Sequence, residues 1–132
     1  MAKKVMVVDD DLYIRELYVE VLTDEGYVVD SAVNGEEAYA KLKNGGYDLV
    51  LLDIMMPKMD GLGVMEALQK TEPPVKNGPI LILTNLDHDP LITDAMSRGA
   101  SAFIIKADIT PEDLLIQVRR FLGETPAAQP VN

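Results

Sequence analysis

Polar residues stand at the carboxyl ends of four apolar runs in this chain, and together they could carry out chemistry on a phosphate group. A cluster of carboxylates with one hydroxyl and one ammonium suits phosphoryl transfer, because that reaction depends on positioning and charge neutralisation more than on covalent assistance. In an open parallel sheet, ligands bind at the carboxyl ends of the strands, so these side chains are candidates for a single site. The residues that follow the runs KVMVV, LVLL, ILIL and AFII are, in order, Asp9 and Asp10, Asp53, Thr84, and Lys106.

Three carboxylates at one edge of a sheet require positive charge nearby. Two unit charges about 4 Å apart repel by about 4 kcal/mol at an effective dielectric constant of about 20. A single ammonium from Lys106 cannot offset that repulsion, whereas a hard cation that prefers oxygen ligands can. Mg²⁺ is the usual choice where the cation must also hold phosphate oxygens. We therefore expect Asp9, Asp10 and Asp53 to bind Mg²⁺ as a cofactor.

The apolar runs have the pattern of buried strands. They are continuously apolar rather than alternating, which is typical of a parallel sheet that is covered on both faces. A fifth candidate strand, YVVDSA at residues 27–32, contains Asp30 and Ser31, and these polar residues indicate an edge position.

The segments between the runs have helical spacing. Apolar residues at i, i+3, i+4, i+7 and i+8 predict the first helix: Ile14, Leu17, Tyr18, Val21 and Leu22. Asp11 and Thr110 are the expected N-caps of the first and last helices. Five strand–helix units in strict alternation predict an α/β fold with right-handed crossovers. One common strand order, 2-1-3-4-5, places Asp53 beside Asp9 and Asp10.

Length and composition predict one globular domain. The chain has 132 residues, of which we assign 1–123 to the domain and 124–132 to a flexible, proline-containing tail. The net charge of −10 opposes direct binding to nucleic acid or anionic lipid. There are no cysteines, which excludes disulfides and cysteine-based zinc sites. No segment approaches the ~20 apolar residues that span a bilayer, so we expect a cytoplasmic protein.

The stretches MVVDDD, LVLLDIMMPKMDG, LILT and AFIIK occur in this order within residues 3–122, and LLDIMMPKMDG is highly specific. With these motifs the chain resembles the receiver domains of two-component response regulators, including the single-domain chemotaxis type. The resemblance implies a flavodoxin-like (βα)5 fold, a doubly wound parallel sheet with strand order 2-1-3-4-5. It also implies a phosphorylation switch with weak self-phosphorylation and self-dephosphorylation activity, rather than an enzyme that acts on a separate metabolite.

The resemblance also implies roles for individual residues. Asp53 corresponds to the phosphoacceptor, Asp10 to a direct metal ligand, and Asp9 to a weaker or water-mediated one. The backbone carbonyl of Met55 is expected to complete the protein ligands of Mg²⁺.

Further positions correspond to groups that respond to the phosphate. Thr84 and Lys106 are expected to hold phosphoryl oxygens. Phe103 occupies the position of the family's switch aromatic, which is expected to turn inward when Thr84 moves toward the phosphate.

Two residues at the border of the site depart from the family pattern. Ala107 follows Lys106 where the family commonly has a proline, often with a cis peptide bond; a cis bond without proline costs about 3–4 kcal/mol, so we expect trans. Asn85 stands where the family usually has a small residue. Met55 and Leu86 correspond to positions that border the approach of water to the phosphate. Both are apolar, which predicts slow hydrolysis of the acyl phosphate.

The expected partners are a sensor histidine kinase or phosphotransfer protein as phosphoryl donor, and a target protein that binds the face of the fourth helix, fifth strand and fifth helix. A monomer and a phosphorylation-dependent dimer are both compatible with the sequence. Two alternatives remain open. One is a phosphohydrolase of the haloacid-dehalogenase type, with Asp9 as nucleophile of a D-x-D motif. The other is a degenerate receiver that serves only as a docking module.

Overall fold

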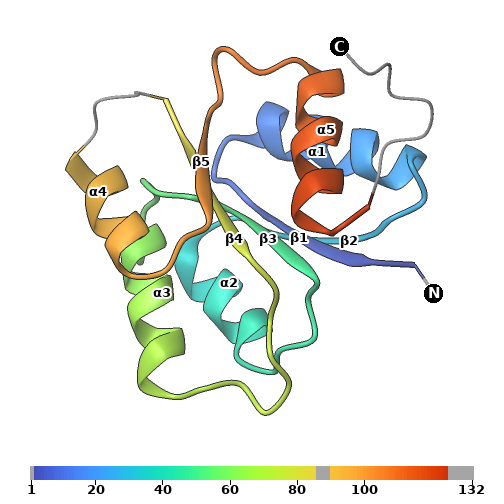
Figure 1. Ribbon diagram of the computed structural model, residues 1–132. Coiled ribbons are helices and arrows are strands. Elements are labelled where there is room, and N and C mark those ends of the chain that lie inside the picture. The colour runs from blue at the N-terminus through green and yellow to red at the C-terminus, as the bar shows by residue number, and fades with distance from the viewer. Residues whose placement is uncertain (1, 86–89, 125–132) are drawn as a thin grey trace.

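Five parallel strands form a single sheet in the order β2-β1-β3-β4-β5 in the computed structural model of the chain, which describes residues 2–85 and 90–124 (Figure 1). The strands are β1 (Lys4–Val8), β2 (Val28–Ala32), β3 (Leu49–Asp53), β4 (Ile80–Thr84) and β5 (Ala102–Ile105). This order confirms the flavodoxin-like α/β fold that the sequence predicted. It places β2 and β5 at the two edges and β1 beside β3 at the centre.

The helices lie on both faces of the sheet. They are α1 (Leu12–Asp24), α2 (Gly35–Leu42), α3 (Gly61–Lys70), α4 (Pro90–Ser97) and α5 (Pro111–Phe121). Helices α1 and α5 cover one face, whereas α2, α3 and α4 cover the other (Figure 1). The alternation of strands and helices in the sequence therefore corresponds to a doubly wound sheet.

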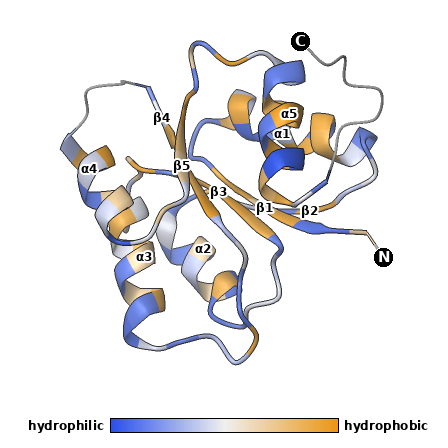
Figure 2. Cartoon of the chain, in the orientation of Figure 1, coloured by the Kyte–Doolittle hydropathy of each residue, from blue (hydrophilic) through white to orange (hydrophobic). Residues whose placement is uncertain are grey.

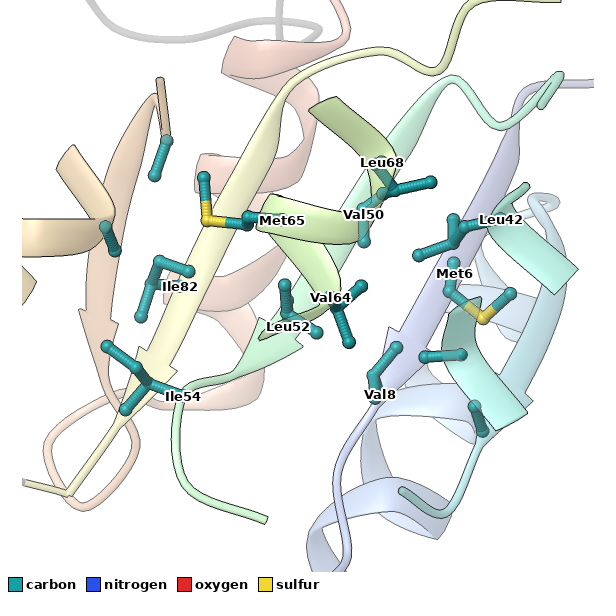
Figure 3. Close-up of a cluster of buried hydrophobic side chains, with 14 of the residues drawn as sticks. Met6, Val8, Leu42, Val50, Leu52, Ile54, Val64, Met65, Leu68 and Ile82 are labelled. Atoms are coloured by element: carbon teal, nitrogen blue, oxygen red, sulfur yellow. The ribbon is translucent and has the colours of Figure 1, made fainter. Parts of the chain in front are cut away.

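Both faces of the sheet are packed against helices, which explains why the strand sequences are continuously apolar. Alternate residues of each strand point to opposite faces. The strands at the centre of the sheet are accordingly hydrophobic over most of their length (Figure 2), whereas the edge strand β2 contains Asp30 and Ser31. On the face covered by α2, α3 and α4, buried strand residues pack against helix residues such as Leu42, Val64 and Met65 (Figure 3). The strand residues in this cluster are Met6, Val8, Ala32, Val50, Leu52 and Ile82.

The second core cluster lies on the face of α1 and α5. Its strand members are Val5, Val7, Leu49, Leu51, Leu81, Leu83 and Ile104. Tyr18 and Leu22 of α1 and Leu114 and Val118 of α5 pack against them. The predicted periodic spacing in α1 is thus confirmed at Tyr18 and Leu22, whereas Leu17, which the same spacing placed on the buried face, is 42% exposed.

The first and last helices begin at the residues expected from the sequence. Asp11 is the N-cap of α1 and its carboxylate accepts a hydrogen bond from the backbone N–H of Ile14 at 3.1 Å. Thr110 is the N-cap of α5 and forms a capping box with Asp113. These caps satisfy backbone donors that have no partner inside the helix, so the helices start just beyond the tips of β1 and β5.

The register of the strands aligns their carboxyl ends. Val8 pairs with Leu52 across the β1–β3 boundary, and Asp53 pairs with Leu83 across the β3–β4 boundary. At the edge, Thr84 pairs with Ile105. The residues that follow β1, end β3 and β4 and follow β5 therefore lie at one edge of the sheet.

The chain beyond α5 is described as far as Glu124. Its carboxylate accepts a hydrogen bond of 2.6 Å from the hydroxyl of Tyr27, although the sequence placed Glu124 in the tail. Residues 125–132, the remainder of the predicted flexible tail, lie outside the described residues. Among the helices within the described ranges, none has the length and apolar character needed to cross a bilayer.

Candidate functional site

Side chains from four strand ends meet at a pocket at the carboxyl edge of the sheet. Asp9, Asp53 and Thr84 are almost completely buried, at 0%, 3% and 2% exposure, whereas Asp10 is exposed. The pocket has a volume of about 540 Å³, ample for a phosphoryl group and a hydrated ion. Seven of the residues that line it were predicted as site residues from the sequence: Asp10, Asp53, Met55, Thr84, Asn85, Lys106 and Ala107.

The three carboxylates converge as expected. Asp9, Asp10 and Asp53 each place one carboxylate oxygen within 4.8 Å of those of the other two. Asp9 and Asp10 come from the end of β1 and Asp53 from the end of β3, its neighbour in the sheet. Because all the donors are oxygens of charged groups, the set fits a hard divalent cation such as Mg²⁺. Among the described residues, this is the one cluster of its kind.

Lys106 bridges two of these carboxylates. Its ammonium nitrogen lies 3.0 Å from Oδ2 of Asp9 and 3.1 Å from Oδ2 of Asp53. The Lys106 side chain is only 7% exposed, so water and salt screen the two ion pairs only weakly. Its backbone N–H donates to the carbonyl of Thr84 at 2.8 Å, so the tip of β5 is tied to β4. The predicted proximity of Lys106 to the carboxylates is therefore present.

Backbone groups hold the outer oxygens of the two buried carboxylates. Oδ1 of Asp9 accepts the N–H of Asp11 at 2.9 Å, and Oδ1 of Asp53 accepts the N–H of Met55 at 3.1 Å. Each carboxylate thus has one oxygen fixed by the loop that follows it and the other directed at Lys106. This arrangement orients the carboxylates before any ligand binds.

Burial and mutual repulsion change the proton affinity of Asp53. Desolvation is the main cause, and together with the negative charge of Asp9 it raises the pKa of Asp53 to about 7, against the opposing influence of Lys106 and the Met55 N–H. Desolvation alone would lower the pKa of Lys106, but the charges of Asp53 and Asp9 raise it overall. Lys106 therefore stays charged at neutral pH. A further cation at the site would favour the ionised form of Asp53.

Arg15 is a site residue that the sequence analysis missed. Its guanidinium donates a hydrogen bond of 2.8 Å to the backbone carbonyl of Asp9 and so secures the turn between β1 and α1. The sequence feature that could have drawn attention to it is that Arg15 is the one basic residue of the helix LYIRELYVEVLTD. Its partner could not be named from the sequence, because the contact depends on how α1 packs above the end of β1.

The residues predicted to border the site have different positions. Asn85 and Ala107 are exposed at the rim of the pocket, and the side chain of Met55 is 62% exposed. There are no cis peptide bonds among the described residues, so the Lys106–Ala107 bond is trans as predicted. Leu86 lies outside the described residues.

Phe103, the predicted switch aromatic, lies on the edge strand β5 and is 41% exposed. It belongs to the surface formed by β5 and α5, away from the carboxylates. Its exposure describes one orientation of the ring, so the expected inward movement stays a prediction. The role of the Met55 carbonyl as a metal ligand likewise stays a prediction.

Comparison with known proteins agrees with this geometry. The family model of the response regulator receiver domain matches residues 5–119. The chain is 38% identical over 106 residues to the chemotaxis protein CheY of Treponema pallidum, covering 78% of this chain and 72% of that protein. It is 35% identical over 119 residues to the transcriptional regulatory protein ResD of Bacillus subtilis. That match covers 90% of this chain but only 48% of ResD, so the chain spans about half the length of this relative.

A solved structure shares both the fold and a clear sequence similarity. The response regulator TrrA of Thermotoga maritima, in complex with Mg(2+)-BeF, superimposes with a TM-score of 0.74 at 39% identity. The match covers 90% of this chain and 98% of that one. The sheet order, the three converging carboxylates and the matched residues 5–119 lead to one assignment. The chain belongs to the receiver domain family of two-component response regulators.

Proposed function

We propose that this receiver domain is a switch that accepts a phosphoryl group on Asp53 with the help of Mg²⁺. The observation that carries the proposal is the convergence of Asp9, Asp10 and Asp53 at the carboxyl edge of the sheet, with Lys106 within 3.0–3.1 Å of two of them. An exposed acidic cluster alone would not suffice, but here two of the three carboxylates are buried and already oriented by backbone N–H groups.

In the proposed reaction, an oxygen of the Asp53 carboxylate attacks the phosphorus of a phosphohistidine. A new P–O bond forms, the P–N bond breaks, and the histidine of the donor takes up a proton. Asp9, Asp10, Asp53 and the carbonyl of Met55 would hold Mg²⁺, which would supply positive charge to the phosphoryl oxygens. Lys106 neutralises developing charge from the opposite side.

Asp53 is the proposed nucleophile because of its place among the carboxylates. Its Oδ2 faces Lys106 at the pocket, whereas its Oδ1 is engaged by the Met55 N–H. Asp9 is completely buried and makes no contribution to the pocket lining. The haloacid-dehalogenase alternative, which requires attack by Asp9, finds no support in the family that the chain matches.

We further propose how the modification is transmitted. Thr84 ends β4 beside the pocket, and its movement toward a phosphoryl group would free space for Phe103 to turn inward. Two pre-existing conformations would then change in population. The surface of α4, β5 and α5 would present this change to a target protein.

Several finer assignments belong to the same proposal. Residues 1–123 form the receiver domain, and a sensor histidine kinase or phosphotransfer protein in the cytoplasm supplies the phosphoryl group. The domain has weak self-phosphorylation and self-dephosphorylation activity, and is a monomer or dimerises on phosphorylation. The apolar Met55 at the pocket rim predicts slow hydrolysis.

The direct test is to map the modified residue. The chain is incubated with Mg²⁺ and a small phosphodonor such as phosphoramidate, and the acyl phosphate is reduced with borohydride and located by peptide mass spectrometry. Modification at Asp53, absent in Asp53→Asn, supports the proposal. Modification at Asp9 would support the phosphohydrolase alternative, and no modification under any donor would support the docking module.

A further inference from the structure

The hydroxyl group of Tyr18 is buried without a hydrogen-bond partner. Among the buried side-chain nitrogen and oxygen atoms in the part of the chain that the structure describes, it is the one atom in this condition. Tyr18 is only 3% exposed. An unpaired buried hydroxyl costs free energy that a phenylalanine of nearly the same shape would avoid. The hydroxyl therefore requires an explanation beyond packing.

Tyr18 lies on the protein side of the carboxylate site. It follows Ile14, which lines the pocket, by one helical turn on the same face of α1. Its ring packs in the core cluster that contains Val7 of β1, two residues before Asp9, and Leu114 of α5. The side chain thus lies in the core beside strand β1, which leads into Asp9.

The charges of Asp9 and Lys106 act on this hydroxyl. Burial is the main reason why the pKa of Tyr18 is raised; the negative charge of Asp9 raises it further, and the positive charge of Lys106 opposes both. Tyr18 is therefore a protonated donor at neutral pH. A carboxylate is a stronger acceptor for such a donor than a neutral group.

Asp9 shares its partner Lys106 with Asp53 and would lose it if the ammonium moved to a phosphoryl group. Its Oδ1 accepts the Asp11 N–H, and its Oδ2 accepts a hydrogen bond from Lys106 at 3.0 Å. Lys106 is shared with Asp53, so an acyl phosphate there would draw the ammonium toward the phosphoryl oxygens. On the pocket side the Asp9 carboxylate can contact the bound cation, and because Asp9 is completely buried any further hydrogen-bond donor to its Oδ2 must come from within the protein.

We propose that Tyr18 is a positioning residue of the phosphorylated state, whose hydroxyl donates a hydrogen bond to Asp9 when Lys106 moves to the phosphoryl group. The inference rests on the proposed function and adds a residue that acts through Asp9. The hydroxyl is unpaired in the unmodified protein and paired in the modified one. It therefore favours the modified conformation over the unmodified one.

The test compares Tyr18→Phe with the wild type, using beryllium fluoride and Mg²⁺ as the probe for the phosphoryl group. The variant should unfold at the same or a higher temperature than the wild type in the absence of the probe, because no hydrogen bond is lost. Its affinity for beryllium fluoride, measured by titration, should fall by roughly tenfold to a hundredfold, as expected for the loss of one hydrogen bond to a charged group. The control is Tyr13→Phe, the same chemical change at a residue of α1 that is 83% exposed.

A second readout follows the hydroxyl itself. In protein labelled with 3-fluorotyrosine, the ¹⁹F resonance that disappears in Tyr18→Phe should shift when beryllium fluoride binds. If Tyr18→Phe binds the probe as tightly as the wild type, or if it is destabilised without the probe, the inference is wrong although the proposed function stands. If the wild type itself gives no response to beryllium fluoride with Mg²⁺, the proposed function fails and the inference falls with it.

Discussion

Lys106 and Asp53 form an ion pair of 3.1 Å in which both side chains are at least nine-tenths buried. The pair joins the tip of edge strand β5 to the tip of central strand β3. Such a contact is expensive to break, since the remaining carboxylates would be left without their cation. The electrostatic balance of the site therefore depends on a residue 53 positions away in the sequence.

Replacing Lys106 tests this dependence. Lys106→Met should raise the pKa of Asp53 further, because Lys106 is a group that lowers it. The rate of phosphorylation by a small donor at pH 7 should fall about 100-fold, in line with the loss of one preorganised charge. The rate is measured by intact mass spectrometry over time. Lys106→Arg, which keeps the charge, is the matched variant, and an equal loss in both would point to shape rather than charge.

Magnesium should stabilise the folded protein. Millimolar Mg²⁺ should raise the melting temperature, because the cation binds the folded cluster of Asp9, Asp10 and Asp53 and not the unfolded chain. Thermal melts in Mg²⁺ and in EDTA give the shift. Asp10→Ala should lose most of it, whereas Asp11→Ala should keep it because Asp11 caps α1. An unchanged transition in Mg²⁺ would contradict the metal site.

Removing the charge of Asp53 should stabilise the protein in the absence of a divalent cation. The pKa of this carboxyl is raised to about 7 in the folded state from an ordinary value of 3.8, so the folded state binds the proton more tightly than the unfolded state. The protonated Asp53 carboxyl therefore contributes to the free energy of unfolding in full below about pH 4. This contribution is lost as the pH rises through about 7. Asp53→Asn should keep this stability at high pH, because the asparagine side chain carries no charge.

The expected pattern is a melting temperature for Asp53→Asn that exceeds that of the wild type by a few degrees at pH 8 in EDTA. The difference should shrink steadily toward pH 4 and also in Mg²⁺, because the cation offsets the repulsion. Asp108→Asn, at an exposed position, provides the control for a simple loss of charge. A pH-independent difference between Asp53→Asn and the wild type would contradict the assigned cause.

The first residue of α3 should tolerate no side chain. A Cβ at Gly61 would lie 2.7 Å from the backbone oxygen of Asp53 and 2.9 Å from Cα of Ile54, so the loop after β3 would have to shift. Gly61→Ala should lower both the melting temperature and the rate of phosphorylation. Gly63→Ala is the matched control: its Cβ would meet side-chain atoms and no backbone, Cγ of Met59 at 2.9 Å and Oδ1 of Asp60 at 3.4 Å, and alanine is favoured over glycine in a helix by about 1 kcal/mol. Equal effects of the two would contradict this account.

Much of the fold could be predicted because the sequence pattern is local. Continuous apolar runs marked the strands, and periodic spacing with Asp11 and Thr110 as caps marked the ends of the helices. The carboxylate site could be predicted because strand ends in a parallel sheet meet at one edge. Asp53 and Lys106 could therefore be placed together without any knowledge of their side-chain orientations.

Contacts that depend on tertiary packing could not be predicted. The role of Arg15 required the position of α1 above β1, and the unpaired hydroxyl of Tyr18 required the whole core around it. Asp30 was recognised only as a sign of an edge strand. In the structure it accepts a hydrogen bond of 2.7 Å from the hydroxyl of Tyr47 and pairs with Lys41. Contacts of this kind depend on how helices and strands pack together, and no short-range sequence pattern reports that packing.

The edge position of β5 makes the strand that carries the cationic group of the site less restrained than the strands that carry the carboxylates. The acidic groups stand on β1 and β3, each held by a strand on both sides, whereas Lys106 stands beyond a strand with one neighbour. The carboxylates are thus held by the interior of the sheet, whereas the ammonium of Lys106 is held at its edge and can move more easily. A new negative charge on Asp53 would therefore displace Lys106 and the end of β5 more than the carboxylates. The movement would reach the edge of the sheet, where Phe103 of β5 is exposed to solvent.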